Sequence, residues 1–334
     1  MDTGSSNLWV CAKTCPNCTP HSFFDPTTSK TFAKTSSTPV NLTYGTGSVV
    51  GTIDSDSFAF GTLTLPNQQF LLATAEDTFL SNNMNHLWDG ILGMGLMGLS
   101  QGPGTLTQGT PGPLTPILNM IAQNVVSVPV FSVWIGTSQG ATSANALGEL
   151  AVGGCDTAHF TGSVTCLPVV GMDDTSTLGF WQVPLTGVSL NAPGFKTSLP
   201  LGSASTAIMD TGSTIIGLPF TLLNELLSAL NAGLDPVQQG VFAINCPTTV
   251  SQLAALPNIT FTLSGVDFAL TPEDYLAQDT SSGLCIIQVN QIPDSQRGII
   301  LGDTFLRKYY SIYDGESVSL FYFLPPVPTY RISA

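Results

Sequence analysis

The feature that most limits how this chain can fold is an internal repeat. The element Asp-Thr-Gly-Ser-Ser at Asp2–Ser6 returns as Asp-Thr-Gly-Ser-Thr at Asp210–Thr214. An apolar-apolar-Gly element follows in each half, at Ile91–Gly93 and Ile300–Gly302. The distance from Asp to Gly is 93 − 2 = 91 residues in the first half and 302 − 210 = 92 in the second. Because repetition at a matched distance marks copies of one structural unit, we predict two similar lobes in one chain.

Length and hydrophobic pattern predict the architecture of these lobes. A chain of 334 residues suffices for two domains, which we place at residues 1–160 and 161–334. Short apolar or alternating runs broken by Gly, Pro, Asn and Asp dominate, as is typical of strands. The expected strands include Val40–Tyr44, Ser57–Phe60, Val130–Ile135, Ile259–Leu263 and Tyr309–Tyr313, and the expected helices are Leu114–Gln123, Phe220–Ala232 and Thr271–Leu276. The sequence thus predicts a mainly all-β, bilobal fold with a few short helices and a cleft between the lobes.

The charge balance excludes several partners. Asp and Glu number 22 against 8 Lys and Arg, for a formal net charge of −14. Nucleic acids and anionic membranes bind clustered Lys or Arg, so neither is expected. Most of the negative charge is neutralised at about pH 4, which suits an acidic medium. No apolar run reaches the length of a membrane span, and sequons at Asn17, Asn41 and Asn258 fit a secretory route.

One aspartate from each copy can form a catalytic pair, Asp2 with Asp210. Two carboxyls that share a site cannot easily both ionise, so one keeps a proton at acid pH. The ionised member can act as general base on a water while the protonated member donates to a substrate carbonyl. This chemistry hydrolyses a peptide without metal, cofactor or covalent intermediate. In each copy the Gly, Gly4 or Gly212, lets the backbone turn tightly beside the carboxyl.

Seven segments spread along nearly the whole chain share one family pattern: Asp2–Val10, Leu42–Ser48, Trp88–Gly93, Phe180–Gln182, Ala207–Thr214, Ile300–Asp303 and Tyr309–Asp314. In these segments the sequence resembles the pepsin-like aspartic proteases. The resemblance implies a monomeric, acid-active endopeptidase with polypeptide substrates, either secreted or in an acidic vacuolar-lysosomal compartment. The alternative, of another class, is a catalytically silent protein of this fold that only binds peptides or a partner. Both aspartates and their following serines are present, which favours activity.

The resemblance also implies roles for residues around the pair. Ser5 and Ser213 would hydrogen-bond the outer carboxylate oxygens. Trp9 would steady Tyr44, which lies on a flap at Leu42–Ser48.

Further residues would contact the substrate. Gly45 and Thr46 would bond its backbone, and Ile91, with Phe79 or Trp88, would favour apolar residues on both sides of the cut. The two aspartates in the supporting loops, Asp89 and Asp303, would be buried structural carboxylates.

Two departures from the family pattern are evident. A strand should run into the first catalytic aspartate, as Ser203–Met209 runs into the second, but only Met1 precedes Asp2. The resemblance therefore predicts that an N-terminal strand and any prosegment are missing, and that the short chain works poorly. Phe180 stands where pepsin has a tyrosine, and the lost hydroxyl should alter binding more than catalysis.

Seven cysteines allow several pairings. The run Cys11-x3-Cys15-x2-Cys18-x2-His21 could ligate zinc, but a disulfide with one cysteine left over fits a secreted protein better. The resemblance favours Cys15–Cys18, although Cys11–Cys15 and Cys11–Cys18 remain open, and it implies Cys246–Cys285. A third pair, Cys155–Cys166, would staple the turn-rich stretch between them.

Two other motif readings fail. Gly93–Gly98 matches the G-x-G-x-x-G fingerprint, but Leu99–Gly104 cannot form the helix that a dinucleotide site requires. The three histidines, His21, His86 and His159, are scattered and form neither a zinc-protease motif nor part of a serine-hydrolase one. The expected site therefore contains no metal and no cofactor.

Overall fold

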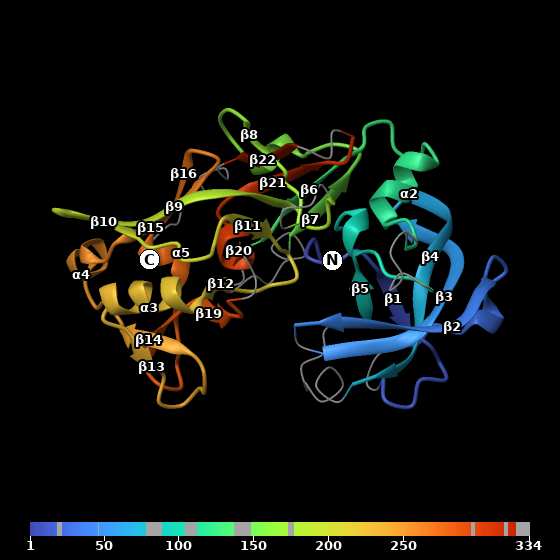
Figure 1. Cartoon of the computed structure of the whole chain (residues 1–334), viewed down its shortest axis with the longest axis horizontal. Helices are drawn as coiled ribbons and strands as arrows, with labels where there is room; N and C mark the ends of the chain where they lie inside the picture. The colour runs from blue at the N-terminus through green and yellow to red at the C-terminus, as the bar shows by residue number, and fades with distance from the viewer. Residues whose placement is uncertain are drawn as a thin grey trace. The chain divides into compact units, whose positions relative to one another are not determined.

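The structure is a computed structural model that describes residues 1–18, 22–45, 47–77, 89–103, 112–136, 148–172, 177–294, 298–316 and the backbone of 320–324. The chain forms two compact units (Figure 1). Unit 1 comprises Met1–Pro129 with Thr177–Phe180, and unit 2 comprises Val130–Ser176 with Trp181–Ala334. Both consist mainly of strands, so the prediction of a mostly β, pepsin-like fold is confirmed.

Unit 1 is built around one five-stranded sheet with the order β2-β3-β4-β1-β5. Its strands are β1 (Leu8–Cys11), β2 (Ala33–Tyr44), β3 (Gly47–Phe60), β4 (Leu63–Glu76) and β5 (Gly90–Leu92). The helical segments are η1 (Pro26–Thr28), η2 (Met97–Leu99) and α2 (Pro116–Ala122). Strand β1 is short and runs parallel to β4 but antiparallel to β5. Strand β1 thereby joins the start of the chain to β5, which follows some ninety residues later.

Buried apolar side chains on β1 organise the core of unit 1. Trp9 is fully buried and packs with Val40, Leu42, Val49 and other members of one cluster. Leu8 faces a second cluster, because successive side chains of a strand point to opposite faces. Both faces of β1 are therefore covered, which fixes the strand that follows the first aspartate.

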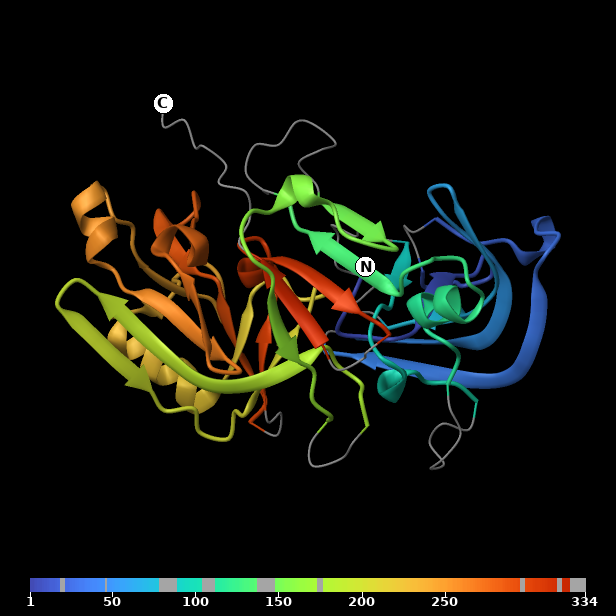
Figure 2. The same ribbon diagram turned by 90° about the horizontal axis from the view of Figure 1, so that it is seen from above.

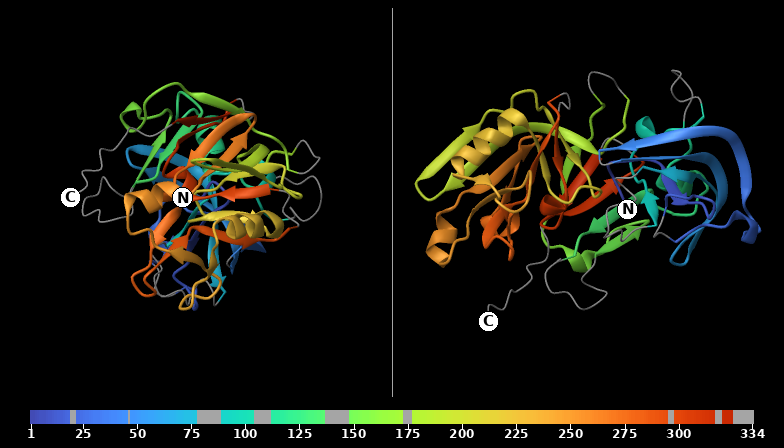
Figure 3. Two further views of the ribbon diagram at one scale, coloured as in Figure 1. Left: turned by 90° about the vertical axis from the view of Figure 1, so that its left-hand side faces the viewer. Right: turned by 90° about the horizontal axis from the view of Figure 1, so that it is seen from below.

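The described strands of unit 2 form three sheets. The largest has the order β16-β15-β9-β11-β20-β12-β19, with β10 paired to β9 as a long hairpin (Figure 2). Its strands are β9 (Gln182–Ala192), β10 (Phe195–Leu199), β11 (Thr206–Met209), β12 (Ile216–Pro219), β15 (Asn258–Leu263), β16 (Val266–Leu270), β19 (Val289–Ile292) and β20 (Gly298–Leu301). Helix α3 (Phe220–Ala229) buries four leucines and packs on β12, β19 and β10 (Figure 3).

Two smaller sheets complete unit 2. One has the order β13-β14-β18-β17, from β13 (Gly233–Leu234), β14 (Phe242–Asn245), β17 (Leu276–Gln278) and β18 (Leu284–Ile287). The other has the order β7-β6-β21-β22-β8, from β6 (Val130–Trp134), β7 (Glu149–Val152), β8 (Thr165–Pro168), β21 (Tyr310–Asp314) and β22 (Leu320–Leu324). Short helical segments are η4 (Thr157–His159), α4 (Val250–Ala255), α5 (Pro272–Tyr275) and α6 (Asp303–Leu306).

The pairing of β6 with β21 moves the division of the chain. The sequence predicts that residues 130–160 form the last part of the first lobe. In the structure β6 and β7 join a sheet with the C-terminal strand β21. The compact units therefore divide at Pro129, and we keep 1–160 and 161–334 only as a proposal for the extent of the repeated lobes.

The predicted helices exist, with shorter ends. Helix α2 begins at Pro116 rather than Leu114, because proline suits the first helical position, where its missing N–H costs nothing. Helix α3 ends at Ala229 rather than Ala232. Asn231 takes the left-handed conformation, at φ 51°, and the amide of Ala232 bonds the carbonyl of Leu227, which closes the helix. Among the described residues, no helix is both long and apolar enough to span a membrane.

The cysteines agree with two of the three expected pairs. Cys15 bonds Cys18 and Cys246 bonds Cys285, whereas Cys11 is a buried free thiol. The predicted Cys155–Cys166 disulfide is wrong, because both cysteines are free and exposed.

The sheet order explains this correction. Cys155 follows β7, and Cys166 lies on β8, at the opposite edge of the sheet β7-β6-β21-β22-β8. The turn-rich stretch between them crosses the sheet and packs Phe160 against Tyr310. It therefore separates the two thiols.

Thiol labelling of the folded protein checks this arrangement. We expect Cys155 and Cys166 to react quickly, since both are exposed. Cys11 should react only on unfolding, because burial raises the pKa of its thiol to about 12, with the charges of Glu76 and Asp89 adding to the rise. Mass spectrometry of labelled peptides reads the result. Protection of Cys155 and Cys166 until a reductant is added would contradict it.

Candidate active site

The first aspartate turn holds its carboxylate with two hydrogen bonds. Asp2 Oδ1 accepts the amide of Gly4 at 2.8 Å, and Oδ2 accepts the Ser5 hydroxyl at 2.5 Å. The side chain is buried, with 9% exposed. Each oxygen is therefore tied to a partner two or three residues away, which fixes the carboxylate plane relative to the turn.

The segment after β5 supports this turn through the backbone. The Asp2 amide donates to Leu92 at 2.9 Å, and the Met94 amide donates back to Asp2 at 2.8 Å. The Gly95 amide bonds the Ser5 carbonyl at 2.7 Å. The amides of Met94 and Gly95 thus bond the aspartate turn, whereas those of Leu96 and Gly98 bond Gly179 and Leu178. The helical segment η2 is only three residues long, which agrees with the interpretation of Gly93–Gly98 as a loop.

The second turn has the same internal pattern. Asp210 Oδ1 accepts the amide of Gly212 at 2.8 Å, and Oδ2 accepts the Ser213 hydroxyl at 2.8 Å. The Asp210 amide donates to Leu301 at 3.1 Å, as that of Asp2 donates to Leu92. Asp210 is half-buried and follows β11 directly.

The element after β20 supports the second turn. The amide of Asp303 bonds the Ser213 carbonyl at 2.8 Å, and the buried hydroxyl of Thr304 bonds Thr214 O at 3.2 Å. A Cβ on Gly302 would lie 2.2 Å from Ser213 O. On Gly93 it would lie 2.6 Å from the backbone of Asn7. Glycine is needed at both places because the supporting loop touches the backbone of the turn.

The β2–β3 hairpin brings Tyr44 to the first turn. Burial raises the pKa of the Tyr44 hydroxyl and the charge of Asp2 raises it further, while the nearby polar groups of Trp9 and Ser5 oppose the rise. These four predicted site residues therefore lie together in unit 1. Gly45 is exposed at the hairpin tip with open space around it.

Other predicted residues have mixed outcomes. Ile91 pairs with Trp9 across β5 and β1 and packs on the same cluster. Thr46, Phe79 and Trp88 lie outside the described residues. Asp303 is half-buried, with 20% of its side chain exposed, so it is less buried than predicted, and its structural role stays a prediction.

Asp89 departs from its prediction. It is exposed, and its carboxylate accepts the amide of Ser22 at 2.7 Å. The expectation of a buried carboxylate is therefore wrong, because Asp89 precedes β5 on the surface rather than lying beneath the turn.

Sequence reasoning missed three residues that brace the turns. The buried Ser6 hydroxyl bonds Leu96 O at 2.6 Å, and the Asn7 amide group bonds the Gln101 backbone in both directions, at 2.7 and 2.9 Å. In unit 2 the Thr304 hydroxyl makes the corresponding hydrogen bond, to the carbonyl of Thr214. A buried polar side chain needs a partner, so the run of small polar residues after each aspartate carried the signal.

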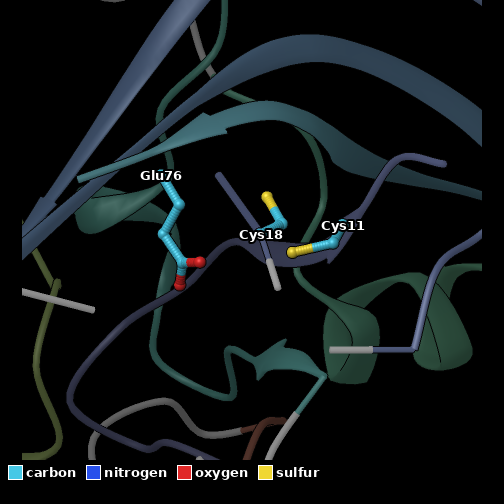
Figure 4. Close-up of side chains that lie close together, drawn as sticks. All are labelled: Cys11, Cys18 and Glu76. Atoms are coloured by element: carbon cyan, nitrogen blue, oxygen red, sulfur yellow. The ribbon is translucent and has the colours of Figure 1, made fainter. Parts of the chain in front are cut away.

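Within the described ranges, two groups of donor atoms could be considered for a cation. Cys11, Cys18 and Glu76 are buried with donor atoms within 4.8 Å of one another (Figure 4). Because Cys18 is bonded to Cys15, this group offers two ligands rather than three.

The second group lies on the surface of unit 2. His159 Nε2 is 3.3 Å from Glu149 and 3.7 Å from Asp156. The contact between His159 and Glu149 is within hydrogen-bonding distance, so the arrangement does not require a cation.

An aspartate turn of one design in each half of a mostly β chain, with a tyrosine hairpin beside the first, defines an aspartic-type peptidase. Residues 1–320 match the family of eukaryotic aspartyl proteases, and the chain belongs to that family. It is 33% identical to gastricsin of Mus musculus, covering 94% of this chain and 74% of the relative.

Other relatives agree. Cathepsin E of Rattus norvegicus is 34% identical over 94% of this chain and 73% of its own length, and a probable vacuolar protease A of Trichophyton verrucosum is 33% identical over 94% and 71%. The chain is an aspartic endopeptidase, and its relatives fit the expected secreted or vacuolar-lysosomal location.

Replacing Gly302 tests the support of the second turn. In Gly302→Ala the new methyl group would meet the Ser213 carbonyl at 2.2 Å, so the turn must shift. A displacement of about 1 Å can cost on the order of 100-fold in rate. We expect such a loss in kcat/KM on a peptide substrate. Gly233→Ala, where nothing lies within 4 Å, is the matched control. Equal activity of the two variants would refute the proposed support.

Asp303→Asn tests the charge beside the same turn. Burial raises the pKa of Asp303 to about 6, and the Arg307 charge opposes this. The folded state therefore binds this proton more tightly than the unfolded chain. Stability falls as pH rises from 3.8 to about 6, by about 3 kcal/mol from this group.

Urea unfolding at several pH values measures the effect. We expect Asp303→Asn to flatten the fall in unfolding free energy across that interval. The exposed Asp267→Asn should leave it as in the unaltered protein. Identical pH profiles for Asp303→Asn and the unaltered protein would contradict the assignment.

Proposed function

We propose that this endopeptidase works at acid pH, with Asp2 and Asp210 as a catalytic pair that shares one proton and activates one water. The observation that carries the proposal is the matching geometry of the two turns. In each, Oδ1 accepts a glycine amide and Oδ2 accepts a serine hydroxyl, at 2.8 and 2.5 Å for Asp2 and at 2.8 and 2.8 Å for Asp210. Because the two carboxylates accept matching hydrogen bonds, they suit a reaction in which the two exchange the roles of acid and base.

The proposed reaction needs one ionised and one protonated carboxyl. The ionised aspartate removes a proton from the water as it attacks the scissile carbonyl, and the protonated one donates to the carbonyl oxygen. Collapse of the tetrahedral intermediate breaks the C–N bond: the amine leaves with a proton from the pair, and one hydroxyl of the intermediate returns its proton to the pair as the new carboxyl group forms. The carboxyls end as they began, with one proton between them. Ser5 and Ser213 keep the outer oxygens oriented throughout.

The proposed substrate is an extended polypeptide with apolar residues on both sides of the cut. Tyr44 and the exposed Gly45 end the hairpin beside the first turn, and the exposed backbone of an extended strand can bond a peptide. Ile91 is half-buried against Trp9 and offers an apolar surface next to the same turn. We propose that Thr46, Gly4 and Gly212 contribute to substrate contacts, and that the enzyme acts as a monomer without nucleic-acid partners.

Activity at acid pH follows from the need of the aspartate pair to keep one proton. Rising pH removes that proton, so activity should fall toward neutrality. The same change ionises Asp303, beside the second turn, at pH about 6. With 22 acidic and 8 basic residues, the chain also gains self-repulsion as pH rises. Chemistry and stability therefore favour the same conditions.

Amide variants of the pair test the proposal. Asp2→Asn and Asp210→Asn each keep the shape of the turn but remove a group that must alternate between acid and base. We expect either to lower kcat by at least about 1,000-fold on a denatured protein substrate at acid pH. Initial rates of cleavage, with peptide products identified by mass spectrometry, are the measurement.

Matched controls are available in each unit. Asp25→Asn, in the exposed ion pair with Lys13, and Asp267→Asn, bonded to Thr262, should retain activity. Thermal unfolding of all four variants separates loss of chemistry from loss of fold. If Asp2→Asn and Asp210→Asn fold and cleave normally, the pair is wrong. A folded, unaltered protein that binds peptides but cleaves none at any pH would favour the silent binder.

A further inference from the structure

We propose that Asn41 is a site of N-linked glycosylation, whereas Asn258, with the same sequence motif, is not. The chain carries three N-x-S/T sequons, at Asn17, Asn41 and Asn258. A sequon is only a necessary condition, since the asparagine must be accessible on the surface. The expected secreted or vacuolar-lysosomal location takes the chain through the compartment where this modification occurs.

The sequon at Asn41 lies on an outer strand with its acceptor group exposed. It reads Asn41-Leu42-Thr43 on β2, the end strand of the sheet β2-β3-β4-β1-β5. Leu42 is 3% exposed and lies in the Trp9 cluster, whereas Asn41 and Thr43 are both exposed. Since side chains alternate along a strand, the two sequon side chains share the outer face. A glycan there would point away from Leu42 and Tyr44.

The sequon at Asn258 is used for internal contacts. It reads Asn258-Ile259-Thr260 on β15, which is paired on both sides, to β9 and to β16. Asn258 is half-buried, and Thr260 is 5% exposed with its hydroxyl accepting the amide of Asn191 at 3.0 Å. A folded sheet cannot present this asparagine with a bulky substituent without breaking that pairing.

The sequon at Asn17 is limited by its middle residue. Cys18 is fully buried and bonded to Cys15, so Asn17 lies inside the loop that this disulfide closes. Disulfide formation in the same compartment competes with glycosylation of Asn17, which requires the segment to be extended. We therefore commit to Asn41.

A glycan at Asn41 would also protect an edge strand of the sheet from pairing with another chain. Strand β2 is 12 residues long and is one of the two edge strands of the sheet among the described strands. Pro39 and the register shift between Lys34 and Pro39 interrupt its first part. The last part, Val40–Tyr44, carries no charge and no proline. An uncharged open edge invites pairing with another chain, and a bulky hydrophilic sugar would prevent it.

The chemistry needs one co-reactant, an oligosaccharide carried on a lipid pyrophosphate. The Nδ2 atom of Asn41 forms a bond to C1 of the first sugar, and the bond from C1 to the pyrophosphate oxygen breaks. Nδ2 loses one proton and the lipid pyrophosphate leaves. No oxidation or reduction takes place.

Expression of the full chain in a eukaryotic secretory host tests the proposal. Peptide N-glycosidase in heavy-oxygen water converts each glycosylated asparagine into a labelled aspartate, which peptide mass spectrometry locates. We expect the label at residue 41 and none at residue 258. Asn41→Gln should lose one glycan by intact mass, and Thr43→Val should lose the same glycan although Asn41 remains. Asn258→Gln is the matched control and should keep the glycan at Asn41.

Two results would overturn the inference. One is an unlabelled Asn41 in secreted, folded protein. The other is a label at Asn258. Because the label is read from peptides of the unaltered chain, the result does not depend on whether a variant folds. It is also independent of catalysis, so a failure of the proposed acid mechanism would leave it standing.

Discussion

Each aspartate turn depends on backbone hydrogen bonds to a strand that follows far along the chain. The amide of Asp2 bonds Leu92 O, and the amide of Asp210 bonds Leu301 O. Such bonds require close approach of two backbones, which a side chain at Gly93 or Gly302 would prevent. Buried backbone groups must find partners, so the loops and the turns specify each other. The position of the carboxylates follows from this mutual support rather than from side-chain packing alone.

The two turns share that support but differ in their surroundings. Asp2 is buried beneath a tyrosine hairpin, whereas Asp210 is half-buried. Asp303, with a pKa raised to about 6, lies beside the second turn. The scarcity of Lys and Arg leaves few ion pairs to be lost in acid.

The sequence predicts the repeat, the β architecture and the residues of the turns, because these depend on local patterns and on glycine and polar residues at fixed offsets. It places helix α3 correctly but not its end, since the left-handed Asn231 could not be distinguished from a helical asparagine. It fails for Cys155 and Cys166, which are near in sequence but lie at opposite edges of a sheet. The roles of Ser6, Asn7 and Thr304 depend on partners some ninety residues away, which the sequence does not reveal.

The central claim is that Asp2 and Asp210 form one catalytic pair. The most direct test is a high-resolution crystal structure of the chain, in which the separation of the two carboxyl groups is measured. The account predicts that their nearest oxygens lie within hydrogen-bonding distance, about 3 Å, and that one shared water contacts both. Carboxyl groups on separate surfaces, with no water in common, would contradict the account.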